Sequence, residues 1–202
     1  MSAREEVLGR IRTALGEDRT VPPVARDYRT TDERSPAELL DVLTDRLEDY
    51  KATVVRCAPD GVAAAVAGAV AGLPGDVVVA PGVPADWRPD GAVEDDGRPA
   101  VALASYAATV TGVATAIAET GTLVLDGSPL AGRRVLSLLP DVLVCVVEAA
   151  QVVGTVPEGL AVLDPIAPLT MISGPSATSD IELQRVEGVH GPRTLVVVLV
   201  AG

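Results

Sequence analysis

The sequence predicts an α/β fold with a mostly parallel sheet flanked by helices, preceded by an N-terminal helical arm. Its apolar runs at 122–125, 142–147 and 195–200 are rich in β-branched residues and show no polar alternation. Such runs are typical of strands that are covered on both faces. Helical patterns lie between the strand-like runs, which favours a parallel sheet with crossover helices. The core must consist of Val, Leu, Ile and Ala, because the chain has no Phe, one Trp and three Tyr.

Residues 1–34 are expected to form a helix and a linker, and residues 35–202 a single α/β domain. Ser2 and Glu5 have the spacing of a capping box, so the first helix begins there. Its apolar residues share one helical face: Val7, Leu8, Ile11 and Leu15. The polar, proline-containing segment 17–34 is typical of a linker or an extended arm. The apolar face needs a partner surface, either on its own domain or on another subunit of a homo-oligomer.

The elements of the domain can be placed in order along the chain. Ser35 and Glu38 form a second capping box, with Pro36 at the first helical position. We then expect a strand at 53–57, an Ala-rich helix at 61–71, a strand at 77–80, apolar runs at 101–104 and 108–113, and a helix at about 132–139 between two of the long strands. Near the C-terminus, Ser179 and Glu182 have the spacing of another capping box and predict a further helix.

Charge and cysteine usage exclude several classes of function. With 16 basic and 28 acidic residues, the formal net charge is −12, whereas nucleic-acid binding needs clustered basic side chains. Cys57 and Cys145 lie far apart in apolar runs, without a Cys-x-x-Cys or His/Cys cluster, which excludes a Cys-ligated zinc or iron–sulfur centre. We assign no metal and no cofactor to this chain. No apolar signal sequence or membrane-spanning segment is apparent, which predicts a cytoplasmic protein without membrane insertion.

A first candidate site is the segment Glu119-Thr120-Gly121-Thr122, directly before a strand-like run. It combines a carboxylate, two hydroxyls and a glycine that allows close backbone approach to a small ligand. Glu119 has the chemistry of a general base, a nucleophile or a hydrogen-bond acceptor. The structural alternative is a turn in which Gly121 takes a positive φ angle and Glu119 is solvated.

A second candidate site lies between residues 173 and 182, after the strand-like segment 169–172. A helix N-terminus surrounded by hydroxyl groups is a ready site for a carboxylate or a phosphate. The residues expected to bind a ligand here are Gly174, Pro175, Ser176, Thr178, Asp180 and Glu182. Asp180 and Glu182 either satisfy the helix dipole or turn away to help hold a metal. The structural alternative is a well-capped helix without a ligand.

His190, the only histidine, lies in a glycine-flanked turn and could act in acid–base chemistry or as a pH-sensitive ligand-binding group. Arg133, Arg134 and Arg193 could hold an anionic substrate or pair with surface carboxylates, and surface pairing is the simpler expectation. In open α/β sheets, ligands bind at the carboxyl ends of the strands, so we expect the loops at 119–122 and 174–178 to converge there. The chain contains no dinucleotide fingerprint, Walker loop or serine-hydrolase elbow.

Several motifs together resemble the LUD-domain family: the segments 117–125, 136–140, 174–182 and 188–192. The resemblance implies an α/β fold similar to the sugar-phosphate isomerase and coenzyme A transferase-like superfamily. It also implies a role in bacterial L-lactate utilisation, in which L-lactate is oxidised to pyruvate with two iron–sulfur partner proteins. The absence of cluster cysteines agrees with this chain being the third component.

Two functions therefore follow as expectations. In the first, the chain is a subunit of a lactate-oxidising system and binds its partners and a small anionic ligand. In the second, it is an independent coenzyme A transferase-like enzyme that transfers acyl groups through Glu119, since Glu119-Thr120-Gly121 is similar to the glutamate loop of coenzyme A transferases. A glycine-rich coenzyme A signature is not found. Because the chain is acidic, binding of an anion requires a locally positive pocket.

Overall fold

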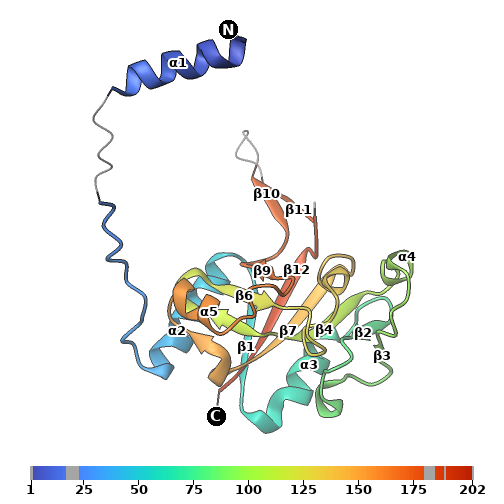
Figure 1. The fold of residues 1–202 in the computed structure, drawn as a ribbon. Helices are drawn as coiled ribbons and strands as arrows, with labels where there is room; N and C mark the ends of the chain where they lie inside the picture. Colours follow the sequence, from blue (N-terminus) through green and yellow to red (C-terminus); the bar gives the residue numbers. More distant parts are fainter. Residues whose placement is uncertain (1, 17–22, 180–184, 189, 202) are drawn as a thin grey trace.

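The computed structural model describes residues 2–16, 23–179, 185–188 and 190–201 (Figure 1). Helix α1 (Ala3–Leu15) begins at the predicted capping box, in which the Ser2 and Glu5 side chains cap each other's backbone N–H groups. None of its residues is buried, and the helix stands apart from the domain (Figure 1). The apolar face of α1 is thus exposed and does not dock on its own domain. Homo-oligomerisation through this helix stays a prediction.

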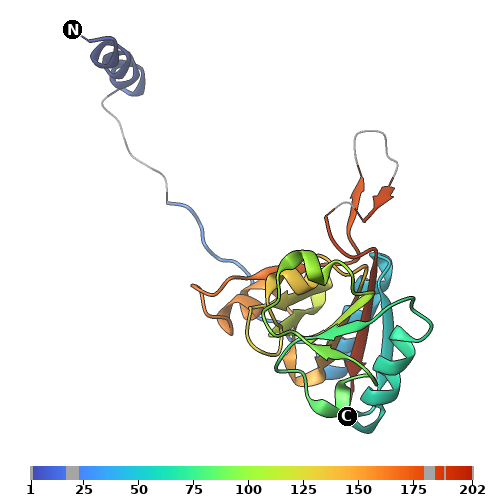
Figure 2. The ribbon, with the colours of Figure 1, turned by 90° about the vertical axis from the view of Figure 1, so that its right-hand side faces the viewer.

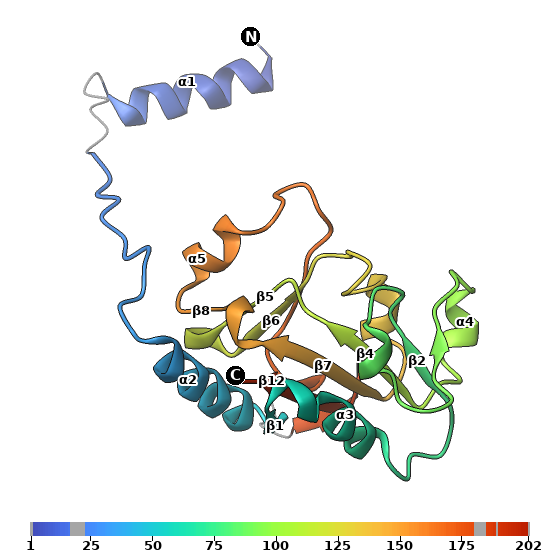
Figure 3. The ribbon, with the colours of Figure 1, turned by 90° about the horizontal axis from the view of Figure 1, so that it is seen from below.

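The central sheet has six strands, and every pairing within it is parallel. In spatial order they are β1 (Thr53–Cys57), β12 (Thr194–Val200), β7 (Val142–Glu148), β4 (Ala108–Gly112), β2 (Val77–Val79) and β3 (Val93–Glu94). Helices α2 (Pro36–Asp49) and α3 (Val62–Val70) flank the sheet, and α4 (Ala100–Leu103) lies near its β2–β3 end (Figure 3). The predicted α/β class with a mostly parallel sheet is confirmed.

Strand β7 shows why the long apolar runs carry no polar alternation. Leu143, Cys145 and Val147 belong to one buried cluster with the leucines of α2. Val144 and Val146 belong to a second cluster with the valines of α3. Since successive side chains of a strand point to opposite faces, both faces of β7 are buried in apolar surroundings. Each such side chain adds about 1.5–3 kcal/mol of hydrophobic stabilisation.

A second, four-stranded sheet covers the α2 side of the domain and was not predicted from the sequence. Its strands, in spatial order, are β8 (Val152–Val153), β5 (Thr115–Ile117), β6 (Thr122–Leu125) and β9 (Thr170–Ile172). Strand β6 runs antiparallel to both of its neighbours. Helix α5 (Val156–Ala161) follows β8, and a separate antiparallel pair, β10 (Ala177–Ser179) with β11 (Arg185–Glu187), projects from the domain (Figure 2).

Two predicted helices differ in the structure. The helix expected at 132–139 is only a single 3-10 turn, Arg134–Ser137, because Gly132 has a φ of 72° and Pro140 follows closely. The prediction of a helix that begins at Ser179 is wrong at that residue, because Ser179 lies in β10 and pairs with Arg185. Cross-strand pairing there provides hydrogen-bond partners for the backbone groups that a capping box would otherwise bind. Among the described helices, none is long and apolar enough to cross a membrane.

Candidate functional site

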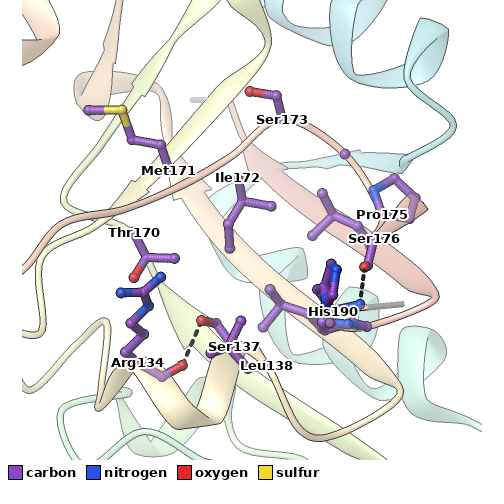
Figure 4. Close-up of a pocket in the computed structure, with 15 residues that line it drawn as sticks. Arg134, Ser137, Leu138, Thr170, Met171, Ile172, Ser173, Pro175, Ser176 and His190 are labelled. Atoms are coloured by element: carbon purple, nitrogen blue, oxygen red, sulfur yellow. Dashed lines mark hydrogen bonds between the residues drawn. The ribbon is translucent and has the colours of Figure 1, made fainter. Parts of the chain in front are cut away.

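A cavity of about 270 Å³ lies between the central sheet and the segment that follows β9 (Figure 4). Its apolar walls include Leu143 of β7 and Leu195 of β12, which are both 1% exposed. The 3-10 turn at Arg134–Ser137, the residues 170–176 and the loop at 190–192 close its sides. Concave sites with apolar walls and a few polar groups are where proteins usually hold small molecules.

Arg134 lines the cavity, and its guanidinium has no hydrogen bond or ion pair with another described residue. The other two arginines considered from the sequence are paired with carboxylates. Arg133 donates two hydrogen bonds of 2.7 Å to Asp95, and Arg193 binds Asp141. The hydrogen bond from Arg133 holds the pKa of Asp95 below its usual range. Pairing with a surface carboxylate was thus the right expectation for Arg193, whereas Arg133 pairs with a buried carboxylate and Arg134 is left facing the cavity.

No Asp or Glu is among the described residues that line this cavity, although the chain has 28 acidic residues. Arg134 supplies a positive charge, and the hydroxyls of Ser137, Thr170, Ser173 and Ser176 supply hydrogen-bonding groups. The cavity is therefore locally positive within an acidic protein, as binding of an anion requires.

Backbone hydrogen bonds fix the cavity wall around Ser176. Its N–H donates to the Pro192 carbonyl, and its own carbonyl accepts from the Gly188 N–H, both at 2.8 Å. Its hydroxyl accepts from the His190 N–H at 3.1 Å (Figure 4). Gly174 has a φ of 129°, and a Cβ there would lie 2.9 Å from the Tyr50 carbonyl oxygen. Ser176 and His190 thus lie together at one side of the cavity, with Gly174 and Pro175 in the same wall.

The two predicted loops meet through hydroxyl groups. The Thr122 hydroxyl lies 2.7 Å from that of Thr120 and 2.7 Å from that of Ser173. Ser173 in turn lines the cavity. Gly121 takes the left-handed conformation with a φ of 61°, as the turn interpretation predicts. A Cβ at Gly121 would lie 2.8 Å from the Cβ of Arg46, so a glycine is required where this turn packs on α2.

Glu119 is not among the residues that line the cavity and instead binds the N-terminal arm. One carboxylate oxygen accepts a hydrogen bond of 3.1 Å from the Val156 N–H at the start of α5, and the other accepts from the Arg29 guanidinium. Asp32 of the arm is buried beside them, where a Cβ at Gly154 would overlap with it. The structure does not place Glu119 with His190, and a catalytic role for Glu119 stays a prediction.

The cavity lies at the amino ends of β7 and β12, since Leu143 and Leu195 are paired near the start of both strands. From the sequence we expected the ligand at the carboxyl ends of the strands. That rule holds for loops between parallel strands, whereas residues 173–176 follow β9, an edge strand of the second sheet. The apolar walls were not predicted, because no pattern in the sequence indicates that Leu143, Ile172 and Leu195 lie close together in the fold.

The structure describes the second predicted motif only in part. Asp180 and Glu182 are outside the described residues, and Thr178 is described only as part of β10. Among the residues that the structure describes, no group of three or more His, Cys, Asp or Glu side chains could hold a metal ion. The arrangement around Arg134 is suited to bind a small anion by charge and hydrogen bonds.

Comparisons with known proteins identify the family and the fold of the chain. A family model described as the LUD domain matches residues 90–200. "Lactate utilization protein C" of Deinococcus radiodurans is 42% identical over 98% of this chain and 95% of its own length. The Bacillus subtilis protein of the same name is 27% identical over 98% of this chain and 96% of its own length. A crystal structure of a DUF162 family protein from Deinococcus radiodurans has a TM-score of 0.71 and 36% identity, and the match covers 83% of this chain and 99% of that one.

Proposed function

This chain belongs to the LUD-domain family, and on that premise we propose that it is a component of a bacterial L-lactate utilisation system. In this proposal, the system oxidises L-lactate to pyruvate in the cytoplasm with iron–sulfur partner proteins. The chain itself binds a small anion, the substrate or product carboxylate, in the cavity around Arg134. The names of its similar relatives support the pathway, and the cavity supports the ligand class.

The observation that carries the ligand class is the Arg134 guanidinium, which faces the cavity without a carboxylate partner among the described residues. A guanidinium binds a carboxylate through parallel N–H donors, which gives both charge and orientation. The Thr170 hydroxyl lies on the same side of the cavity and can bind the C2 oxygen of a 2-hydroxy acid or a 2-oxo acid, whereas Ser137 donates its hydroxyl hydrogen to the Arg134 carbonyl (Figure 4).

In the proposed reaction, this chain binds the substrate and the partner proteins accept the electrons. Oxidation of L-lactate to pyruvate removes two electrons and two protons from C2 and its hydroxyl. The proposal assigns the electrons to the iron–sulfur centres of the partner proteins and the protons to solvent. Cys145 of this chain is buried and Cys57 is half-buried, and both are free thiols with a raised pKa, so neither is poised as a thiolate ligand.

The direct test is reconstitution of lactate oxidation from purified components. We expect the two iron–sulfur proteins with this chain to reduce an artificial electron acceptor in a lactate-dependent reaction, and to lose most of that rate without it. Arg134→Gln should lower the rate at low lactate concentration about tenfold or more, because a charged hydrogen-bond donor to the substrate is lost. Arg26→Gln is the matched control, since Arg26 is an exposed arm residue outside the cavity. An equal rate with and without the chain would refute the proposal.

A further inference from the structure

We infer that the cavity accepts 2-hydroxy or 2-oxo monocarboxylates whose side chains are longer than the methyl group of lactate. This inference rests on the proposed function, because it takes the Arg134 cavity as the site of the carboxylate.

The apolar part of the cavity is larger than a methyl group needs. Leu143 and Leu195 form part of its wall, and Leu138 and Ile172 extend the apolar surface between Arg134 and the opposite side (Figure 4). The volume of about 270 Å³ is close to the lower end of the range of roughly 300–1,000 Å³ found for sites that hold drug-sized ligands. Lactate has six non-hydrogen atoms and would leave apolar wall uncovered, whereas 2-hydroxy-4-methylpentanoate has nine.

The charges of the cavity favour a single carboxylate. Arg134 and Thr170 lie on one side of Ile172, and His190 and Ser176 lie on the other (Figure 4). Arg134 is the only arginine or lysine among the described residues that line it. A dicarboxylate would place its second charge where the described lining offers no second arginine or lysine, and burying an unpaired charge is costly. The lining therefore suits a carboxylate at Arg134 and an aliphatic chain along Leu138 and Ile172.

The test is calorimetric titration of the full chain at pH 8 with L-lactate, 2-hydroxybutanoate, 2-hydroxy-4-methylpentanoate and malate. We expect binding to tighten about fourfold with each added methylene group up to the capacity of the cavity. Malate should bind at least tenfold more weakly than 2-hydroxy-4-methylpentanoate. Lactate binding as tightly as the longer acids, or tighter, would overturn this inference while leaving the proposed function in place. Binding of none of the four acids would overturn both the inference and the assigned ligand site, whereas the reconstitution above tests the role in lactate oxidation separately.

A steric variant tests whether this cavity is the site of selection. A Cβ at Gly191 would lie 3.5 Å from the Cβ of Ser176 and 4.0 Å from a methyl carbon of Leu138, so Gly191→Ala fits and narrows the cavity. Gly68→Ala in α3 is the matched control, because a Cβ there has no neighbour within 4 Å. We expect Gly191→Ala to weaken binding of the longest acid at least fivefold more than that of lactate. An equal loss for both acids, or none for either, would contradict selection by this cavity.

Discussion

The hydroxyl oxygens of Thr122 and Ser173 lie 2.7 Å apart, although 51 residues separate them in the sequence. Thr122 begins β6 and is buried, and Ser173 directly follows β9 and lines the cavity. This hydrogen bond ties the second sheet to the wall of the proposed ligand site. It also joins the two segments in which the sequence predicted a shared site.

Thr122→Val and Ser173→Ala should each destabilise the fold by about 1 kcal/mol, because each removes this hydrogen bond. The double variant should lose less than the sum of the two, with a coupling of about 0.5–1.5 kcal/mol. Urea unfolding of the four proteins measures this cycle. Strictly additive losses would show that the hydrogen bond does not hold the two segments together.

Gly121→Ala should cost about 1–3 kcal/mol of unfolding free energy. The added Cβ would meet the backbone of α2 at Arg46, and φ is 61° at this position. Gly72→Ala is a suitable comparison, because its φ is also positive at 75° but a Cβ there would meet no atom within 4 Å. Thermal unfolding of both variants separates the cost of the positive φ angle, which the two variants share, from the cost of the overlap with α2, which only Gly121→Ala has. Equal losses in the two variants would show that the contact with α2 contributes nothing.

The pair of Asp95 and Arg133 should make stability depend on pH. Asp95→Asn should cost about 1–3 kcal/mol at pH 7, since a buried carboxylate loses a charged hydrogen bond. The pKa of Asp95 is lower in the folded state than its unfolded value of about 3.9, so its contribution is complete above that pH and is lost as the pH falls through the folded pKa.

Urea unfolding at several pH values checks this expectation. The difference between wild type and Asp95→Asn should be constant from about pH 7 to pH 5 and should shrink below about pH 4. Asp41→Asn serves as control, because Asp41 pairs with Arg56 on the surface and should contribute less than about 1 kcal/mol. A stability difference between wild type and Asp95→Asn that grows toward acid pH would contradict this expectation.

Arg29→Gln should release the arm with little effect on the stability of the domain. Arg29 is mostly exposed and binds Glu119 and Asp32, and exposed ion pairs contribute about 0–1 kcal/mol. Chymotrypsin should then cut faster after Tyr28, an exposed aromatic residue of the arm, and the cleavage rate is measured by mass spectrometry. Arg26→Gln should leave the rate unchanged. No acceleration in Arg29→Gln would mean that other contacts hold the arm.

Local signals in the sequence were sufficient to predict the fold class. The β-branched runs mark β6, β7 and β12, and the Ser35–Glu38 capping box marks the start of α2. The second sheet was not predictable in this way, because short strands such as β8 and β9 gain their stability from pairing with distant segments.

The candidate site was predictable only in part. The hydroxyl-rich segment around Ser176 and the nearby His190 were found from their chemistry. The sequence could not show that Glu119 would be bound by Arg29, which lies 90 residues earlier. Nor could it show that Arg133 would be paired with Asp95 while Arg134 faced the cavity, because both partners come from elements that only the fold brings together.

The position of the ligand site can be tested with isoleucine methyl groups as NMR probes. The chain has five isoleucines, of which Ile172 lines the cavity and Ile117 lies buried two residues before Glu119. We predict that titration of the full chain with L-lactate shifts the δ1-methyl signal of Ile172 and leaves that of Ile117 in place. A shift at Ile117 with none at Ile172 would contradict the Arg134 cavity and point to Glu119 instead.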